Sequence, residues 1–368
     1  MAVLLALLAA VNLPVPGVSA AGVQDSPAGI QIRLRGGERR ALCAVDGGRS
    51  ASCALRARFR LAPGRHTIAV RGVDARGRRS RARTVAVVVP EPAPAPVDVG
   101  GQPVGIAAGG GSLWVSGGSS GELVRLDPSS RTVSARVATG SVQLGSVFVG
   151  SGGAVWTGDF GGGALLRIDP VSGTVAARVA LGGRPTAIAA DPTGELWVGN
   201  LDGGLARVSA AGTRLDPVSF PGGTSCLLFA ASGLWVGTQA GSLVQLDAAA
   251  GTTLGSVTIG ADVDAIADTP GGLWVTTFDG RAALVDPAQR RIVRRVQLPG
   301  RGSGVAYADG GVYVSVYDRG LVLRLDARTG AVTRAIHTGA QPRESLVLGS
   351  TLWVVDQAAG ALTPIAVS

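Results

Sequence analysis

One aromatic residue recurs seven times in nearly the same context, and this repeat limits the possible folds more than any other feature. The copies read "SLWVSG", "AVWTGD", "ELWVGN", "GLWVGT", "GLWVTT", "GVYVSV" and "TLWVVD", with their aromatic residues at Trp114, Trp156, Trp197, Trp235, Trp274, Tyr313 and Trp353. Successive copies are 42, 41, 38, 39, 39 and 40 residues apart. Each copy continues into a third short run that includes a segment such as "RLD", and all but the last then add a Gly-containing turn and a further short run. Four short strands at a period of about 40 residues predict the blades of an all-β propeller, which bury their faces by stacking around an axis.

The last copy predicts how the ring of blades closes. It runs from 340 to 368 and lacks a fourth strand, whereas "APVDVGGQP", before the first copy, matches "ARVALGGRP" at 177–185. Residues 96–100 are therefore expected to supply the missing outer strand, which joins both ends of the ring and leaves no free sheet edge. The sequence thus predicts a seven-bladed β-propeller over 96–368.

Residues 27–90 predict a second, smaller all-β domain. Short apolar runs such as "RALCAV", "RHTIAVRGVD" and "RTVAVVV" alternate with turn residues at the spacing of a small β-sandwich. The Pro-rich residues 91–95 that follow are expected to form a stiff linker. Ahead of this domain, the apolar segment 1–21 ends in small residues and predicts a cleaved export signal. An uncleaved anchor is the alternative.

Cysteine placement also favours export. Cys43 and Cys53 flank a Gly-rich turn symmetrically about Gly48, so we expect them to face each other in a hairpin and to form a disulfide. Cys226 stands in the apolar context "TSCLLF", which predicts a buried, unreactive thiol.

The basic charge of the chain is confined to the first domain. Between 33 and 83 there are 15 Arg and three acidic residues, a net charge of +12, whereas 19 Arg balance 19 acidic residues from 102 onward. The run "ARGRRSRAR" at 75–83 is either a solvated basic face or a surface that adheres to an anionic envelope polymer or to lipid headgroups. Nucleic acid is not expected as a partner, because no aromatic platform for stacking bases accompanies the charge.

Three stretches resemble known families. "LAPGRHTIAVRGVDARGRRS" at 61–80 resembles the end of a bacterial immunoglobulin-like domain. The copy at 311–339, "GVYVSVYDRGLVLRLDARTGAVTRAIHTG", resembles the YVTN-type repeat of secreted bacterial propellers. "PTAIAADPTGELWVGN" at 185–200 is similar to the streptogramin B lyase (virginiamycin B lyase) family. These resemblances imply a secreted protein with an immunoglobulin-like β-sandwich followed by a seven-bladed propeller.

The lyase resemblance implies a His as the acid–base group and Glu residues that hold magnesium near the channel mouth. His337, the one His of the propeller region, falls in the outermost strand of its copy, and Glu122 and Glu195 fall on turns away from the axis. Glu344 alone is left for a metal. We therefore expect no catalytic residue, no metal and no cofactor.

Two rings of residues are predicted around the channel mouth, where propellers usually bind ligands. The first ring consists of the residues that begin each first strand: Val104, Gly145, Thr186, Ser225, Asp264, Ser303, and Arg343 with Glu344. The second consists of the residues three places after each aromatic: Gly117, Asp159, Asn200, Thr238, Thr277, Val316 and Asp356. The candidate ligand-binding residues are the charged and amide members: Asp159, Asn200, Asp264, Arg343, Glu344 and Asp356. They suit a small polar ligand, a cation or a partner protein, and a plain polar lining of the channel is the alternative.

The function expected from these features is that of an exported, monomeric binding or scaffolding protein of the cell envelope, without catalysis. Two alternatives remain open. One is a divergent streptogramin B lyase-like enzyme, a carbon–oxygen lyase, and the other is an extracellular ligand-sensing region.

Overall fold

Strands are the regular structure of this protein. The computed structural model describes residues 19–26, 29–35, 40–54, 56–73, 76–150 and 152–367. The chain divides into two compact units, Met1–Pro92 with Ala331–His337 and Ala93–Gly330 with Thr338–Ser368. Within the described ranges every regular element is a strand, and none is a helix that could cross a membrane. The predicted all-β class is confirmed, while the expected signal segment up to residue 18 lies outside the described residues.

Two antiparallel sheets form the N-terminal part of the first unit. The first has the order β1-β2-β5, with β1 (Ser19–Ser26), β2 (Gly29–Arg35) and β5 (Arg56–Phe59). The second has the order β4-β3-β6-β7, with β4 (Ala51–Cys53), β3 (Arg40–Val45), β6 (Gly64–Val73) and β7 (Arg83–Val89). Ile68 and Val70 on β6 are buried while Arg71 is exposed, since neighbouring residues of a strand face opposite sides.

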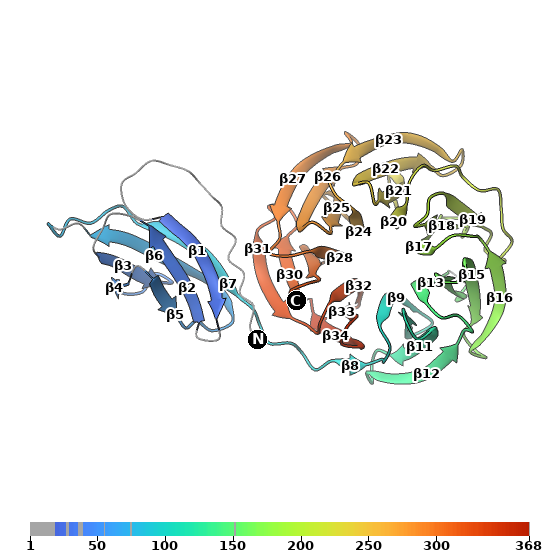
Figure 1. The fold of residues 1–368 in the computed structure, drawn as a ribbon, viewed down its shortest axis with the longest axis horizontal. Helices are drawn as coiled ribbons and strands as arrows, with labels where there is room; N and C mark the ends of the chain where they lie inside the picture. Colours follow the sequence, from blue (N-terminus) through green and yellow to red (C-terminus); the bar gives the residue numbers. More distant parts are fainter. Residues whose placement is uncertain are drawn as a thin grey trace. The chain divides into compact units, whose positions relative to one another are not determined.

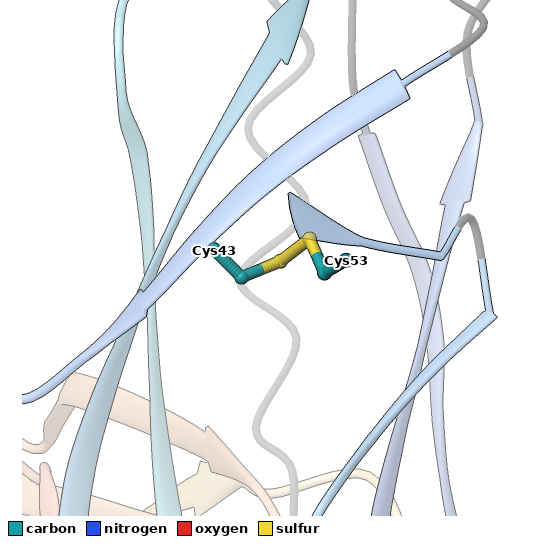
Figure 2. The surroundings of a disulfide bond; sticks show 2 residues. All are labelled: Cys43 and Cys53. Carbon is teal, nitrogen blue, oxygen red and sulfur yellow. A yellow bond between two sulfur atoms is a disulfide. The ribbon is translucent and has the colours of Figure 1, made fainter. Parts of the chain in front are cut away.

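A disulfide between Cys43 and Cys53 links β3 to β4 (Figure 2), with 5.7 Å between the two Cα atoms. The hairpin register differs from the symmetric one that we expected. Cys43 lies opposite Ala51, and Ala41 lies opposite Cys53, so the disulfide runs diagonally across the pair. The turn centre therefore lies one residue before Gly48, at the tight turn that follows Val45, where the Gly48 N–H donates to the Val45 carbonyl.

Seven antiparallel sheets, numbered here in chain order, follow one another through residues 97–150 and 152–367 (Figure 1). Sheets one to three consist of β9 (Pro103–Gly109), β10 (Ser112–Gly117), β11 (Glu122–Asp127) and β12 (Thr132–Ala138); β13 (Leu144–Val149), β14 (Val155–Asp159), β15 (Ala164–Asp169) and β16 (Thr174–Ala180); and β17 (Pro185–Ala190), β18 (Leu196–Asn200) and β19 (Leu205–Val208). Sheets four and five consist of β20 (Thr224–Ala230), β21 (Gly233–Thr238), β22 (Ser242–Asp247) and β23 (Thr252–Thr258); and β24 (Val263–Thr269), β25 (Gly272–Thr277), β26 (Arg281–Asp286) and β27 (Arg291–Gln297). Sheets six and seven consist of β28 (Gly302–Ala308), β29 (Gly311–Val316), β30 (Leu321–Asp326) and β31 (Val332–His337); and β32 (Pro342–Leu348), β33 (Thr351–Asp356), β34 (Ala361–Ala366) and β8 (Val97–Asp98).

The first strand of each sheet lies nearest the common centre, and the last lies at the outside (Figure 1). The repeated aromatic residue of each second strand is buried, and in sheets one to four and seven it packs against the following sheet. Trp114, for example, packs with Leu144, Val155 and Leu166 of sheet two, and is 2% exposed. Its cross-strand partner on β11 is Arg125, whose guanidinium lies 5.5 Å from the Trp114 ring centre. The repeat therefore encodes the contact between sheets as well as the strands themselves.

Sheet three departs from the expected four strands. Its outer position is taken by an irregular segment that pairs only through isolated bridges, Leu205 with Val218 and Val208 with Arg214. Pro217 lies within this segment and has no N–H to donate, so a continuous ladder cannot form there.

Sheet seven gains its outer strand from the start of the second unit. Val97 pairs with Leu362 and Asp98 with Ala361, and the Val99 N–H donates to the Gly360 carbonyl. Val99 is 1% exposed in a core that also contains Trp353. Two segments that are far apart in the chain thus share one sheet.

Candidate functional site

A register shift interrupts the start of every first strand in sheets one to seven. In β24, Val263 pairs with Thr277 and Ala265 with Thr276, so Asp264 is an extra residue. The same shift occurs in β9, β13, β17, β20, β28 and β32. A β-bulge of this kind turns its extra residue out of the regular ladder. The shifts include all the residues expected to begin the first strands: Val104, Gly145, Thr186, Ser225, Asp264, Ser303, Arg343 and Glu344.

Hydrogen bonds at or beside these bulges join each sheet to its neighbour, and we call them the axial ring. Six junctions of the described chain use a hydroxyl donor: Ser116 to the Gly145 carbonyl, Ser146 to that of Thr186, Thr186 to that of Thr224, Ser225 to the Asp262 carboxylate, Thr276 to the Ser303 carbonyl and Ser303 to that of Pro342. At the seventh junction, the Ile106 N–H of sheet one donates to Glu344 Oε2 of sheet seven at 2.9 Å. The small bulge residues thus serve the contact between sheets.

Glu344 is a structural member of the axial ring that carries a charge. Burial raises the pKa of its carboxyl to about 7, while the Ile106 N–H and Arg343 oppose that increase and Asp264 adds to it. The Glu344 carboxyl therefore ionises only near neutral pH, unlike an exposed carboxyl.

Asp264 and Arg343 come together from sheets five and seven. Asp264 Oδ1 lies 4.0 Å from an Arg343 Nη atom, and the two side chains keep 20% and 35% of their surface accessible. Burial raises the pKa of Asp264 to about 6, with Arg343 opposing the rise and Asp262 adding to it. The intervening sheet six makes room with Gly304, where a Cβ atom would lie 2.1 Å from the Arg343 carbonyl oxygen.

Neither charge takes part in the axial ring. Among the described residues, Asp264 accepts no hydrogen bond, and the Arg343 guanidinium donates none; its other contact is the Tyr317 ring, 6.0 Å away. Sheets five and seven therefore place a weakly paired carboxylate and guanidinium beside the axis.

The second predicted ring does not line the mouth, and this expectation is corrected. Asp159 and Asp356 are 2% and 0% exposed, and both still pair with a residue at the start of the neighbouring first strand. Asp159 accepts from Arg178 at 2.6 Å and from the Gly162 N–H at 2.8 Å. Asp356 accepts from Thr363, and burial raises its pKa to about 6. These carboxylates hold local turns and strands together.

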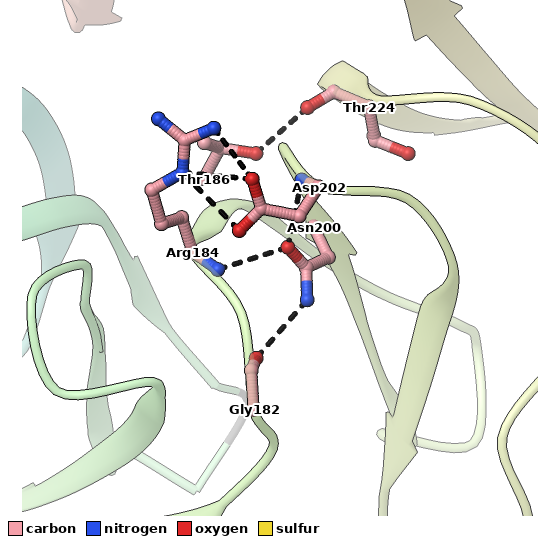
Figure 3. A network of polar contacts seen from close by, with 6 residues as sticks. All are labelled: Gly182, Arg184, Thr186, Asn200, Asp202 and Thr224. Atoms are coloured by element: carbon pink, nitrogen blue, oxygen red, sulfur yellow. Dashed lines mark hydrogen bonds and ion pairs between the residues drawn. The ribbon is translucent and has the colours of Figure 1, made fainter.

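Asn200 belongs to a third, separate network (Figure 3). Its Oδ1 accepts from the N–H groups of Arg184 and Asp202 at 2.9 and 3.0 Å, and its Nδ2 donates to the Gly182 carbonyl at 3.0 Å. All of its polar atoms are therefore used to fix the loops of sheet three.

The residues at the mouth lie one position beyond the predicted ring. In each sheet, the N–H of the residue four places after the repeated aromatic donates to the carbonyl of the residue at or just before the start of the first strand. These pairs are Gly118 with Gln102, Phe160 with Gln143, Leu201 with Arg184, Gln239 with Gly223, Phe278 with Asp262, Tyr317 with Arg301, and Gln357 with Gln341. The sequence offered one signal for these positions: the residue four places after each aromatic varies from copy to copy.

Aromatic rings and guanidinium groups gather in one sector of this mouth. The Phe278 and Tyr317 rings lie 5.4 Å apart, with Arg301 5.2 Å from the Phe278 ring. A hollow beside them is bounded in part by Leu298 and Asp318. Sequence reasoning missed this group because it extrapolated from the residues three places after each aromatic.

Metal and nucleophile chemistry would need clustered acidic, His or Cys side chains or a reactive thiol. Among the described residues, no group of three or more His, Cys, Asp or Glu side chains is placed to hold a metal ion. Burial raises the pKa of the Cys226 thiol well above its ordinary value, and the thiol contacts the Val263 carbonyl at 3.2 Å. This thiol is therefore a poor nucleophile at neutral pH.

The solved structures that resemble this chain include propeller lyases. A streptogramin B lyase has a TM-score of 0.64 at 14% identity, covering 73% of this chain and 96% of its own. A catalytically inactive virginiamycin B lyase from Staphylococcus aureus, solved with quinupristin, has a TM-score of 0.66 at 14% identity, covering 74% and 98%. The hydrazine synthase of Kuenenia stuttgartiensis has a TM-score of 0.63 at 14% identity, covering 72% and 95%. No protein-family profile and no curated protein matches the chain. The similarities establish the propeller fold alone.

Proposed function

We propose that the protein is an exported binding protein of the cell envelope whose second unit is a seven-bladed β-propeller that holds a small polar ligand at its channel mouth, without catalysis. Two further parts of the proposal are that the N-terminal sheets form an immunoglobulin-like sandwich and that the propeller acts as a monomer. The disulfide between Cys43 and Cys53 is compatible with an extracytoplasmic location.

The observation that carries the proposal is the weakly paired charge of Asp264 and Arg343 beside the axis. Small side chains complete the axial ring at six junctions, so the scaffold does not require these two charges. A partly enclosed carboxylate and guanidinium that lack hydrogen bonds from the protein cost folding free energy, and a polar ligand would satisfy both.

The competing function is that of a lyase, as in the structural neighbours. Such a reaction needs a proton-transferring group within hydrogen-bond reach of the substrate. His337 ends β31, the last strand in the order of sheet six, three strands away from the first strand, β28. Asp264 would have to act instead; burial raises the pKa of its carboxyl to about 6 and Arg343 opposes that rise, so at neutral pH the group is largely ionised and a weak base.

Binding and lyase activity can be separated with purified protein. We expect no ring opening of quinupristin, with or without magnesium, when product is followed by mass spectrometry. For a polar ligand identified by a calorimetric screen, Asp264→Ala and Arg343→Ala should each weaken binding by about tenfold or more, and His337→Ala should leave it unchanged. Turnover that His337→Ala abolishes would refute the proposal.

The basic run of the first unit supports a second activity, adhesion to an anionic wall polymer. Arg76, Arg78, Arg79 and Arg81 are all exposed in the segment that joins β6 to β7. Such contacts are screened by salt. The full chain should bind teichoic acid in a low-salt pull-down and release it near physiological ionic strength, and replacing these four Arg with Gln should abolish retention. Retention on anionic lipid vesicles instead would identify a membrane surface, and salt-independent retention would contradict an electrostatic role.

A further inference from the structure

We propose that the mouth sector of sheets five to seven binds a zwitterion, a free α-amino acid or a short peptide that carries both a carboxylate and an ammonium group. This inference rests on the proposed function, because it assigns a ligand class to the same mouth. Three residues would make the contacts: Arg343 with the carboxylate, Asp264 with the ammonium group, and Arg301, beyond the Phe278 and Tyr317 rings, with a further polar group of the ligand.

Arg301 and Arg343 are held by aromatic rings and keep their donors available. Arg301 lies 5.2 Å from the Phe278 ring centre and Arg343 6.0 Å from that of Tyr317, and the two rings lie 5.4 Å apart. The Tyr317 hydroxyl donates to Gln357 Oε1 at 3.2 Å, which fixes the ring. Within the described chain, neither guanidinium donates a hydrogen bond. A guanidinium held in this way suits a carboxylate, which accepts paired N–H donors.

Arg184 provides an internal comparison, because it occupies the same repeat position as Arg301. Its guanidinium lies 5.5 Å from the Phe160 ring centre, but it is also bound by Asp202, with 2.9 Å between Arg184 Nε and Asp202 Oδ1 (Figure 3). A carboxylate of the protein therefore already occupies the Arg184 donors. The equivalent carboxylate in sheet six is that of Asp318. Its Oδ1 accepts the Arg301 backbone N–H at 2.8 Å, and the Arg301 guanidinium is left unpaired within the described chain.

Asp264 gives the sector its opposite charge. Its carboxylate is 20% accessible, accepts no hydrogen bond from the described chain, and lies 4.0 Å from Arg343, beyond hydrogen-bond distance. Glu344 differs, because the Ile106 N–H already binds it within the axial ring. A simple anion would satisfy Arg343 and leave Asp264 unpaired, whereas a zwitterion satisfies both charges.

Binding should depend on pH through the ionisation of Asp264. The charged or titratable groups that face this carboxyl are Arg343, Asp262 and Cys226, and Glu344 lies beside it. An ammonium group binds the ionised carboxylate, so affinity should rise by about tenfold between pH 5 and pH 7.5.

The test uses isothermal titration calorimetry on the full chain. The probes are the common α-amino acids and glycylglycine, followed by the N-acetyl and the amide derivative of any that bind. We expect at least one zwitterion to bind at millimolar concentration or below, and its N-acetyl and amide derivatives to bind about tenfold or more weakly. Arg301→Ala and Asp264→Asn should each cause a similar loss, and Arg184→Ala should cause none.

Three results would overturn the inference: no binding by any zwitterion, equal binding by the N-acetyl derivative, or equal effects of Arg301→Ala and Arg184→Ala. Arg301 is exposed, so its substitution does not threaten the fold. If a neutral sugar binds instead and depends on Arg343, the proposed binding function stands while the zwitterion is excluded.

Discussion

At the scale of single residues, Glu344 joins sheet seven to sheet one and also places an ionisable group at that junction. The other six junctions each use a hydroxyl donor, with the Asp262 carboxylate as the acceptor at one of them, whereas Glu344 accepts the Ile106 backbone N–H with a carboxylate of raised pKa, about 7. The unfolded chain ionises a Glu near its ordinary value of 4.5. Between these two values the unfolded state loses a proton that the folded state keeps, so folding stability falls as pH rises.

Glu344→Gln should therefore stabilise the protein at alkaline pH. Gln keeps an acceptor for the Ile106 N–H and carries no charge, so it avoids the cost of a buried carboxylate. We expect a gain on the order of 1 to 3 kcal/mol at pH 8 and little difference near pH 4, where both states of the wild type are protonated. Thermal unfolding of the wild type and of Glu344→Gln between pH 4 and pH 8 measures this difference in stability.

Glu122→Gln is the matched control. Its carboxylate is 38% exposed and lies 3.4 Å from Arg136, a surface ion pair worth about 0.5 kcal/mol or less. A loss of stability in Glu344→Gln at every pH would show that the charge itself holds the junction.

At the scale of elements, the two residues of β8 contribute more than their length suggests. They supply the outer edge of sheet seven, and the next residue, Val99, is buried in the core with Trp353. Without them, β34 would present an unpaired edge, and an apolar cluster between sheets seven and one would face water.

Removing residues 1–101 should lower the melting temperature of the remaining chain far more than removing residues 1–90, because only the longer deletion takes β8 and Val99 away. The loss should amount to several kcal/mol, from one buried Val and a sheet edge. Calorimetry of the two truncated proteins compares them. Equal melting temperatures would disprove a role for β8 in closing the ring.

Point variants in the full chain provide the control. Val99→Asp places a charge in the core, whereas Val142→Asp alters a side chain that is 77% exposed. The first should destabilise by about 3 kcal/mol or more, and the second by less than about 0.5 kcal/mol.

At the scale of the whole molecule, the repeat made the fold predictable and left the site partly hidden. Seven aromatic residues set the phase of the strands, and the residues expected to begin the first strands, Asp264 and Arg343 among them, lie in register shifts that the sequence did not predict. The residues three places after each aromatic were misplaced, because they still pair within the sheet, as Pro342 with Asp356 shows. A shift of one residue along a strand moves a side chain to the opposite face, and the mouth therefore begins one residue later, at positions such as Tyr317.

The sequence also could not show which Arg side chains are bound by a carboxylate of the protein itself. Arg184 and Arg301 stand at equivalent places in the repeat, yet only Arg184 has a carboxylate bound to its guanidinium. That difference depends on the path of the loop carrying Asp202 or Asp318, which periodicity does not define.

The place of β8 in the chain has a consequence for synthesis. Its partner, β34, follows all the other strands of the second unit, so the earliest strand of the ring must wait for the latest one. Contacts between such distant segments form slowly. During synthesis, each intermediate has two unpaired sheet edges, which are prone to self-association and to proteolysis. A chain that stalls before β34 would leave Val99 without Leu362, its partner in the core.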